Sequence, residues 1–243
     1  MTRKSQQEEG AATGAQGVSS PARRFEQKPL VAVAIAGAVI LAFMLFAGAV
    51  MDGELRVFDE WILRALREPG NLADPLGPKW FEEAVRDVTA LGSTVVLTLA
   101  VVIVSAYLWI GNAPAKAAFL IVAVTLGSML NRLLKFGFAR PRPDIVDHGT
   151  FVSTESFPSG HTANSTIIYL MLGMMLARVE ASYRVKLFIF SVCVAISLMV
   201  GMSRIYLGVH WPTDVIAGWA VGAAWVLICW YVLIRIQPVG TRE

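Results

Sequence analysis

Long apolar stretches dominate the chain from residue 30 onward. The clearest, Leu30–Val50, runs for 21 residues without a charge, which at 1.5 Å per residue is enough to cross a membrane core of about 30 Å. Further apolar stretches predict spans at about 89–110, 115–134, 162–178, 186–203 and 213–234. The pattern therefore predicts an all-α integral membrane bundle of six transmembrane helices, with both termini on one side.

Between the first two predicted spans, apolar residues recur at helical spacing. One stripe over residues 58–66 follows i, i+3, i+4, i+7 and i+8 until Pro69 and Gly70 interrupt it. A second, looser stripe covers residues 80–88. We expect two amphipathic helices that lie on the outer membrane surface and cover the bundle. A platform for the entry of lipid is the alternative.

The two ends of the chain are polar. Residues 1–28 are rich in Gly, Ala, Ser and Gln and lack periodicity, so we expect a disordered cytoplasmic tail. A signal peptide is not expected, because a long polar stretch follows its first charges. Residues 29–236 then form one membrane domain, and residues 237–243 form a short cytoplasmic tail.

Composition supports a membrane protein. The mean hydropathy is +0.59 and only 16% of the residues are charged, against about 25% in soluble domains. The net charge of +3 is too small to indicate a nucleic-acid partner. Cys193 and Cys229 lie in apolar stretches, so we expect buried free thiols. Because paired cysteines and His-Glu-x-x-His are missing from the sequence, we expect a chemistry without metal or cofactor.

Three polar clusters stand at the ends of the predicted spans. They are Lys135 with Arg142-Pro143, then Pro158-Ser159-Gly160-His161, then Ser203-Arg204 with His210 and Asp214. Charged residues beside membrane spans cost free energy, so their presence indicates a function. The first two clusters share the loop between spans three and four, and the third lies between spans five and six. Both loops emerge on one face of the membrane, so the clusters can form a single site.

Basic residues near the span ends indicate the orientation. On the side of the termini they are Arg23, Arg24, Lys28, Lys116, Arg178, Arg184, Lys186 and Arg235. If the cations of the three clusters are set aside as functional, the positive-inside rule places the termini in the cytoplasm. The clusters then face the outside of a bacterial plasma membrane, or the periplasm.

Residue types in the first two clusters suit a phosphate group. Arginine and lysine bind phosphate oxygens well, although snorkelling at the interface explains each cation alone and is our interpretation of Arg132 and Arg140. Gly160 lets the backbone approach an anion at a helix N-terminus, and Ser159 can donate its hydroxyl. His161 stands where it can give a proton. An ordinary turn with an interfacial histidine is the alternative.

The third cluster contains a histidine and a carboxylate at i and i+4. With Pro212 in the first turn of a helix, Asp214 can reach Nδ1 of His210 and leave Nε2 as a nucleophile, as in covalent catalysis. A structural His–Asp pair is the alternative. His148 lies in a polar loop with Asp144 and Asp147, and we interpret it as a surface residue.

In combination the three clusters resemble the signature of the type 2 phosphatidic acid phosphatase superfamily. They read Lys-x6-Arg-Pro, Pro-Ser-Gly-His and Ser-Arg-x5-His-x3-Asp over residues 135–214, and the six-span layout agrees with the membrane branch. The resemblance implies that His210, oriented by Asp214, forms a phosphohistidine. His161 would protonate the leaving oxygen and then activate water. The groups implied to hold the phosphate are Lys135, Arg142, Arg204, Ser159 and the Gly160 amide.

The implied activity is hydrolysis of a lipid phosphomonoester or diphosphate. By resemblance to bacterial members, the candidate substrates are undecaprenyl diphosphate, phosphatidylglycerol phosphate and phosphatidic acid, and no protein partner is evident. A lipid phosphotransferase with the same phosphohistidine remains an alternative. A non-catalytic protein that binds or transports anionic lipids is another, but it leaves the His210–Asp214 spacing unexplained. The vanadium haloperoxidases share similar motifs, yet they are soluble.

Overall fold

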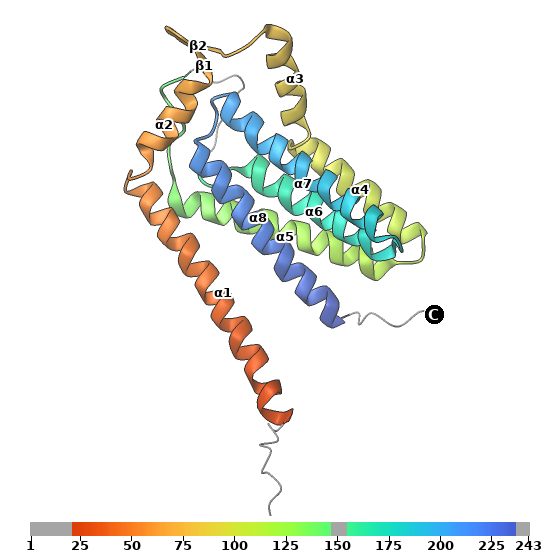
Figure 1. Cartoon of the computed structure of the whole chain (residues 1–243). Helices are drawn as coiled ribbons and strands as arrows, with labels where there is room; N and C mark the ends of the chain where they lie inside the picture. Colours follow the sequence, from red (N-terminus) through yellow and green to blue (C-terminus); the bar gives the residue numbers. More distant parts are fainter. Residues whose placement is uncertain (1–20, 147–154, 237–243) are drawn as a thin grey trace, which may run out of the picture. The chain divides into compact units, whose positions relative to one another are not determined.

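The computed structural model describes residues 21–146 and 155–236, with side chains from Ile35 onward except at Val179 and Ile236 (Figure 1). The helices are α1 (Pro21–Met51), α2 (Arg56–Ala65), α3 (Lys79–Ala90), α4 (Thr94–Ile110), α5 (Pro114–Phe138), α6 (Gly160–Val179), α7 (Tyr183–Tyr206) and α8 (Pro212–Ile236). The antiparallel strands β1 (Arg67–Glu68) and β2 (Asn71–Pro75) form a small hairpin. The chain divides into two compact units after Met44, and the site described below lies in the second, Leu45–Glu243.

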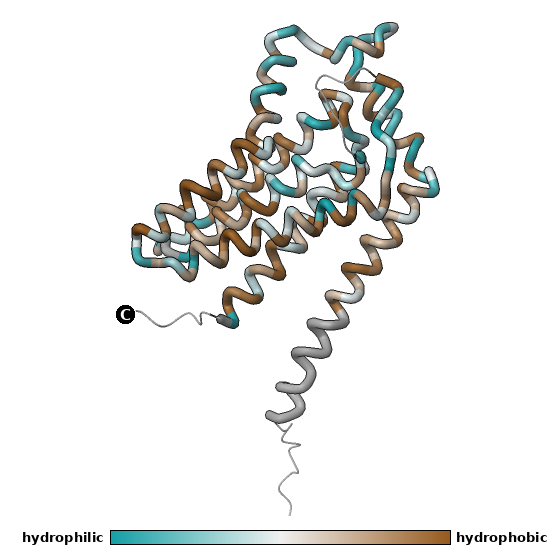
Figure 2. Tube along the Cα trace, turned by 180° about the vertical axis from the view of Figure 1, so that it is seen from behind, coloured by the Kyte–Doolittle hydropathy of each residue, from teal (hydrophilic) through white to brown (hydrophobic). Residues whose placement is uncertain are grey.

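The mainly helical fold predicted from the apolar stretches is confirmed. Among the described residues, α5, α7 and α8 are each long and apolar enough to cross a membrane. Two pairs of consecutive helices give one further span each if each pair is counted as a single bent span. One pair is the part of α1 from Ile35 with α2, bent by 74°, and the other is α3 with α4, bent by 45°. Hydrophobic residues line the long helices of the bundle, while hydrophilic residues gather at the end that carries α3 and the hairpin (Figure 2).

One predicted span begins later than expected. The apolar stretch 89–110 contains the end of α3, a turn, and α4. The turn is fixed at Ser93, whose Oγ accepts a hydrogen bond from the Val96 amide (3.3 Å) and caps α4. Hydropathy alone does not report this break, because the residues on both sides of it are apolar.

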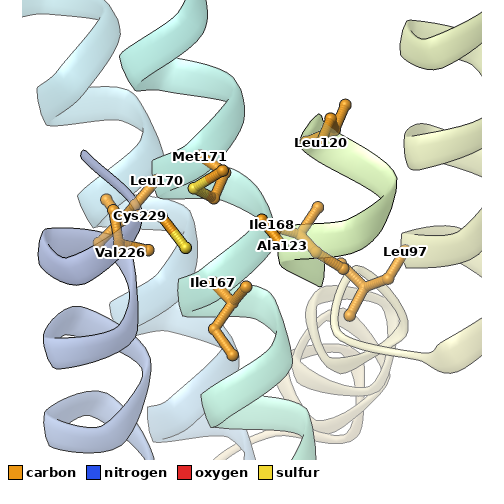
Figure 3. Close-up of a cluster of buried hydrophobic side chains, with 9 residues drawn as sticks. All are labelled: Leu97, Leu120, Ala123, Ile167, Ile168, Leu170, Met171, Val226 and Cys229. Carbon is orange, nitrogen blue, oxygen red and sulfur yellow. The ribbon is translucent and has the colours of Figure 1, made fainter. Parts of the chain in front are cut away.

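Helix α6 is the centre of the bundle and packs against α4, α5, α7 and α8. Its middle contributes four residues to a buried cluster with α4, α5 and α8 (Figure 3). The cluster consists of Leu97, Leu120, Ala123, Ile167, Ile168, Leu170, Met171, Val226 and Cys229. Cys229 is a buried free thiol as predicted, whereas the free thiol of Cys193 is only half-buried.

Glycines let α5, α6 and α8 approach closely. A Cβ at Gly222 of α8 would lie 2.6 Å from Cβ of Thr166 on α6. A Cβ at Gly127 of α5 would lie 2.7 Å from Nε1 of Trp225 on α8. Contacts of this kind, through small residues, are how helices pack inside a membrane. Two of these helices, α5 and α6, carry Lys135 and Gly160 at the ends that meet in the predicted site.

The two amphipathic stripes form α2 and α3. Both helices expose large apolar side chains, among them Val57, Trp61 and Trp80, which are 82%, 67% and 69% exposed. On the other face of α2, Leu63 packs with Ile205, Trp211 and Val215. The Pro69-Gly70 interruption is the hairpin turn between β1 and β2, where Gly70 adopts a φ of +88°.

Candidate active site

All eight predicted site residues lie at one end of the bundle. They are Lys135 in the last turn of α5, Arg142 beyond it, Ser159, Gly160 and His161 at the start of α6, Arg204 in the last turn of α7, and His210 and Asp214 at the start of α8. The Ser159 amide donates to the Asp214 carbonyl (3.0 Å). The structure therefore brings the two predicted loops together on one face.

His210 and Asp214 form a buried pair. Their exposed fractions are 2% and 0%, and His210 Nδ1 lies 3.4 Å from Asp214 Oδ2. The same carboxylate oxygen accepts hydrogen bonds from the Trp211 amide (2.9 Å) and from the Ser156 hydroxyl. These donors fix the carboxylate, so the Nδ1 edge of the imidazole faces a stationary acceptor.

The other edge of the His210 ring faces a cation. Arg142 Nη1 lies 3.2 Å from His210 Nε2 and also donates to the Val209 carbonyl (2.6 Å). Because a guanidinium has only donors, Nε2 is placed as the acceptor and the ring proton belongs on Nδ1. Burial lowers the pKa of His210 to about 3, against the opposing effect of Asp214 and with help from Arg142 and Arg204. A neutral imidazole with a free Nε2 lone pair is the form that acts as a nucleophile.

The predicted phosphate cluster contains two further cations besides Arg142. Lys135 Nζ donates to the Glu155 carbonyl, and Arg204 Nη1 donates to Thr89 Oγ1 (3.0 Å). Arg204 is 3% exposed, and its Nε has no partner within the part of the chain that the structure describes. Burial lowers the pKa of Arg142, while Asp214 and Glu155 raise it. Buried positive groups with unused donors favour an anion, which agrees with the predicted phosphate cluster.

The start of α6 supplies backbone donors. Its first helical hydrogen bond runs from the Ala163 amide to the Ser159 carbonyl (2.9 Å). The amides of residues 160–162 therefore have no acceptor within the helix. A Cβ at Gly160 would lie 3.4 Å from Cε of Lys135, so the lysine stem packs against the glycine. Ser159 is fully buried, and its Oγ accepts from Thr162 Oγ1 (2.9 Å), which leaves its own proton for donation.

His161 is held by packing. A Cβ at Gly92, in the turn between α3 and α4, would lie 3.4 Å from both Cβ and Cδ2 of His161. Thr89 at the end of α3 meets Arg204, as described above. The α3–α4 turn therefore borders the site on the side of His161, a role that the sequence did not indicate.

Our interpretation of Arg140 as a snorkelling residue is wrong. Its side chain is only 10% exposed and bridges two buried carboxylates: Nη1 lies 2.7 Å from Asp214 Oδ1 and Nη2 lies 2.8 Å from Asp59 Oδ2. Since both partners are inside the protein, the charge has no need of the membrane surface. Arg132, which received the same interpretation, is exposed on α5. His148 lies outside the described residues.

Asp59 is a member of the site that sequence reasoning missed. It is fully buried; Oδ1 accepts from the Thr213 amide (2.9 Å) and Oδ2 from the Thr213 hydroxyl (2.7 Å). An acid from α2 thus caps the N-terminus of α8. The predicted stripe did not include Asp59, which lies one turn before the buried Leu63 on the same face of α2.

Comparisons with known proteins identify the family. The model of the PAP2 superfamily matches residues 116–237. Phosphatidylglycerophosphatase B of Bacillus subtilis (strain 168) is 28% identical over 191 residues, which cover 76% of this chain and 87% of the relative. Lipid A 1-phosphatase of Rhizobium etli is 34% identical over 136 residues, which cover 52% of each chain.

A solved structure has the same fold. The crystal structure of a transmembrane PAP2-type phosphatidylglycerolphosphate phosphatase from Bacillus subtilis matches with a TM-score of 0.75 and 25% identity. The match covers 84% of this chain and 98% of that one. The family model spans half of the chain and includes all the clusters that surround His210. The chain therefore belongs to the PAP2 superfamily and is a phosphoric ester hydrolase of bacterial lipid metabolism.

Proposed function

We propose that this protein is a metal-independent lipid phosphate phosphatase that works through a phosphohistidine at His210. The observation that carries the proposal is the environment of that ring, with a carboxylate at Nδ1 and an arginine at Nε2. A protein that only binds anionic lipids needs the cations but not a buried imidazole with a fixed tautomer.

The first chemical step transfers the phosphoryl group to the enzyme. The phosphate binds among Lys135, Arg142 and Arg204 and the amides at the start of α6, and its oxygens take over the Arg142 donor that now faces Nε2. Nε2 of His210 then forms a bond to phosphorus while the bond to the lipid oxygen breaks. His161 gives a proton to that oxygen, and Asp214 stabilises the positive charge that develops on His210.

The second step regenerates the enzyme. His161, now neutral, takes a proton from a water molecule as the water oxygen attacks phosphorus. The bond between Nε2 and phosphorus breaks, inorganic phosphate leaves, and His210 returns to its neutral form. If an alcohol of a second lipid replaces water, the same intermediate gives a phosphotransferase.

The substrate belongs to the membrane lipids that carry an exposed phosphate. Candidates are undecaprenyl diphosphate, phosphatidylglycerol phosphate and phosphatidic acid, and the relatives described above are named for lipid phosphates. The proposed topology has six spans, formed by α1 and α4–α8, with residues 1–28 and 237–243 as cytoplasmic tails. Helices α2 and α3 would lie on the outer surface, where exposed Trp61 and Trp80 suit the membrane interface. The site then faces the outside or the periplasm.

The test is phosphate release by purified protein in detergent with a chelator present. We expect release from lipid phosphates, no release by His210→Ala, and a severe loss in His161→Ala. His148→Ala is the matched histidine control and should keep the unaltered rate. Full activity of His210→Ala would contradict the mechanism. Binding of lipid phosphate by the unaltered protein without turnover would favour a lipid carrier.

The intermediate can be trapped with a substrate that needs no acid. With ³²P-labelled p-nitrophenyl phosphate, whose leaving group departs unprotonated, His161→Ala should accumulate alkali-stable, acid-labile label on the protein. His161→Ala combined with His210→Ala should carry none. Label that survives loss of His210 would place the nucleophile elsewhere.

A further inference from the structure

Arg67, the first residue of β1, is a buried arginine outside the predicted phosphate cluster. It is 4% exposed, and its Nη1 donates to two carbonyls, those of Leu66 (3.1 Å) and Tyr206 (2.8 Å). The first carbonyl belongs to the residue before β1, and the second belongs to the last residue of α7, 139 positions further along the chain. One nitrogen therefore ties the base of the hairpin to the end of α7.

The end of α7 needs donors from outside the helix. The last four carbonyls of a helix have no partner within it. In α7 the first three of these, on residues 203–205, accept from the amides of residues 207–209 in the following turn. Arg67 supplies the donor for the fourth, on Tyr206. Its positive charge also suits the negative end of the helix dipole.

The turn after α7 connects groups of the proposed mechanism. The Val209 amide donates to the Arg204 carbonyl (3.2 Å), and the Val209 carbonyl accepts from Arg142 Nη1. His210 is the next residue. The end of α7 and its turn therefore set where His210 lies relative to Arg204 and Arg142, two of the cations proposed to bind phosphate.

The hairpin region holds Tyr206 a second time, through its side chain. The Tyr206 hydroxyl donates to the Leu76 carbonyl (3.0 Å), and the Leu76 amide donates to the Leu66 carbonyl (2.9 Å). The ring meets Phe81 of α3 edge to face, with centroids 5.4 Å apart. Tyr206 is thus fixed at its carbonyl, its hydroxyl and its ring by residues 66–81.

Stability alone does not explain an arginine at position 67. Its Nε and Nη2 are buried and have no hydrogen-bond partner among residues 35–146 and 155–235. Buried donors without acceptors cost free energy, and an apolar side chain of similar volume would avoid that cost. What the guanidinium supplies, and an apolar side chain cannot, is the hydrogen bond to the end of α7.

We propose that Arg67 is a positioning residue of the phosphatase. By holding the Tyr206 carbonyl, it fixes the turn after α7 and so aligns Nε2 of His210 with the phosphate. This inference rests on the proposed function. Without Arg67 the cations still bind phosphate, but the nucleophile is displaced from the line of attack. A displacement of about 1 Å can cost about 100-fold in rate, so the loss falls on kcat.

The experiment compares Arg67→Met with the unaltered protein on dioleoyl phosphatidic acid in detergent micelles. The substitution should lower kcat about 10- to 100-fold and leave KM within about threefold. The unfolding temperature should stay within about 4 °C, because losing the unpaired donors offsets losing the bond to Tyr206. Arg67→Lys, which keeps a charged donor, should recover part of the rate.

The chemical step can be followed directly in the His161→Ala background. There the label from ³²P-labelled p-nitrophenyl phosphate forms on His210 in the proposed mechanism. Arg67→Met should slow the formation of this label by about the factor seen in kcat. Label that forms at the same rate with and without Arg67 would overturn the positioning role and leave the phosphohistidine mechanism standing.

Arg64→Met is the matched control. Arg64 is an exposed residue of α2 in a surface ion pair with Glu60 (3.5 Å), so both kinetic constants should stay unchanged. Two results would overturn the proposal: a higher KM with an unchanged kcat, or a kcat that falls only in step with the unfolding temperature in both Arg67 variants. Failure of the unaltered protein to hydrolyse any lipid phosphate would remove the proposed function, and the role of Arg67 with it.

Discussion

Arg140 joins the catalytic pair of the proposed mechanism to a residue of a separate helix. Its two terminal nitrogens contact Asp214 and Asp59, and Asp59 in turn caps α8 through Thr213. A planar guanidinium can bridge two carboxylates in this way, whereas a lysine offers one point charge. Arg140 is therefore a positioning residue in this proposal, because it touches Asp214 and not the phosphate.

Arg140→Lys should lower kcat about 10- to 100-fold, since Asp214 loses one of its fixed partners, and should leave KM within about threefold. Steady-state kinetics with a lipid phosphate measure the split. Arg132→Lys, at an exposed position of α5, should leave both constants unchanged. A rise in KM without a fall in kcat would show that Arg140 binds substrate directly.

Asp59→Ala should destabilise the protein by about 3–5 kcal/mol, because it leaves the buried Arg140 with one carboxylate and α8 without its cap. Thermal unfolding in detergent reports the loss. Glu60→Ala is the control one residue along α2, where only surface ion pairs with Arg56 and Arg64 are removed, and its effect should be small. Equal effects of the two substitutions would contradict the role of Asp59.

The pKa of His210 has a consequence for acid stability. The ring has a pKa of about 3 in the folded protein and an ordinary value near 6.5 when unfolded. The folded state therefore binds fewer protons, so the stabilisation is complete above about pH 6.5 and is lost as the pH falls toward 3. Unfolding temperatures between pH 8 and pH 4 should fall more steeply for the unaltered protein than for His210→Gln. His148→Gln should keep the steep slope, and equal slopes in all three proteins would refute the lowered pKa.

The sequence predicts site residues when their partners are near or share a motif. His210 and Asp214 lie one turn apart, and the cations stand at the ends of recognisable spans, so the proximity of these residues could be predicted. Arg140 was misread because its partner Asp59 is 81 residues away, and no local pattern indicates a partner at that distance. Ser156 was overlooked for the same reason, since it is 58 residues from Asp214.

At the scale of elements, the turn between α3 and α4 is the least expected part of the site. Gly92 lies so close to α7 that a Cβ would stand 2.4 Å from Cγ1 of Val200, with His161 at 3.4 Å on another side. Gly92→Ala should displace the turn and with it His161, and kcat should fall at least about tenfold. Gly48→Ala, where no atom lies within 4 Å of the new Cβ, is the control and should leave kcat unchanged.

A second substitution can separate a clash from a general defect. Val200→Ala removes the atom that the new methyl group meets, so Gly92→Ala with Val200→Ala should recover part of the lost rate. If the loss of activation free energy in the double variant equals the sum of the losses in the two single variants, the two residues do not interact.

Helices and strands were predicted well where their length and apolar composition determine them. They were predicted less well where a local hydrogen bond sets the position at which a helix begins. Each predicted span contains a helix, although 89–110 also includes the end of α3 and a turn. The hairpin of β1 and β2 was missed, because its strands are short and polar and depend on contacts with the rest of the fold. The helix start at Thr94 depends on one serine side chain.

At the scale of the whole molecule, the proposed orientation can be tested by labelling. Asp144, on the α5–α6 loop, and Ala181, between α6 and α7, lie beyond opposite ends of α6 and both are exposed. After Cys193→Ala and Cys229→Ala, an impermeant maleimide should label Asp144→Cys in intact spheroplasts. Ala181→Cys should react only after the membrane is opened. The reverse pattern would place the site in the cytoplasm.

The cation cluster also shapes what happens after hydrolysis. In the proposed mechanism Lys135, Arg142 and Arg204 hold the phosphoryl group, and the same positive charges remain in place when the phosphate is free. We therefore expect inorganic phosphate to be a product inhibitor that competes with the lipid for the same binding site. In the proposed outward orientation, the phosphate concentration of the surroundings sets the occupancy of that site. We therefore expect the rate at which the membrane recovers its dephosphorylated lipid to fall as the phosphate concentration outside rises.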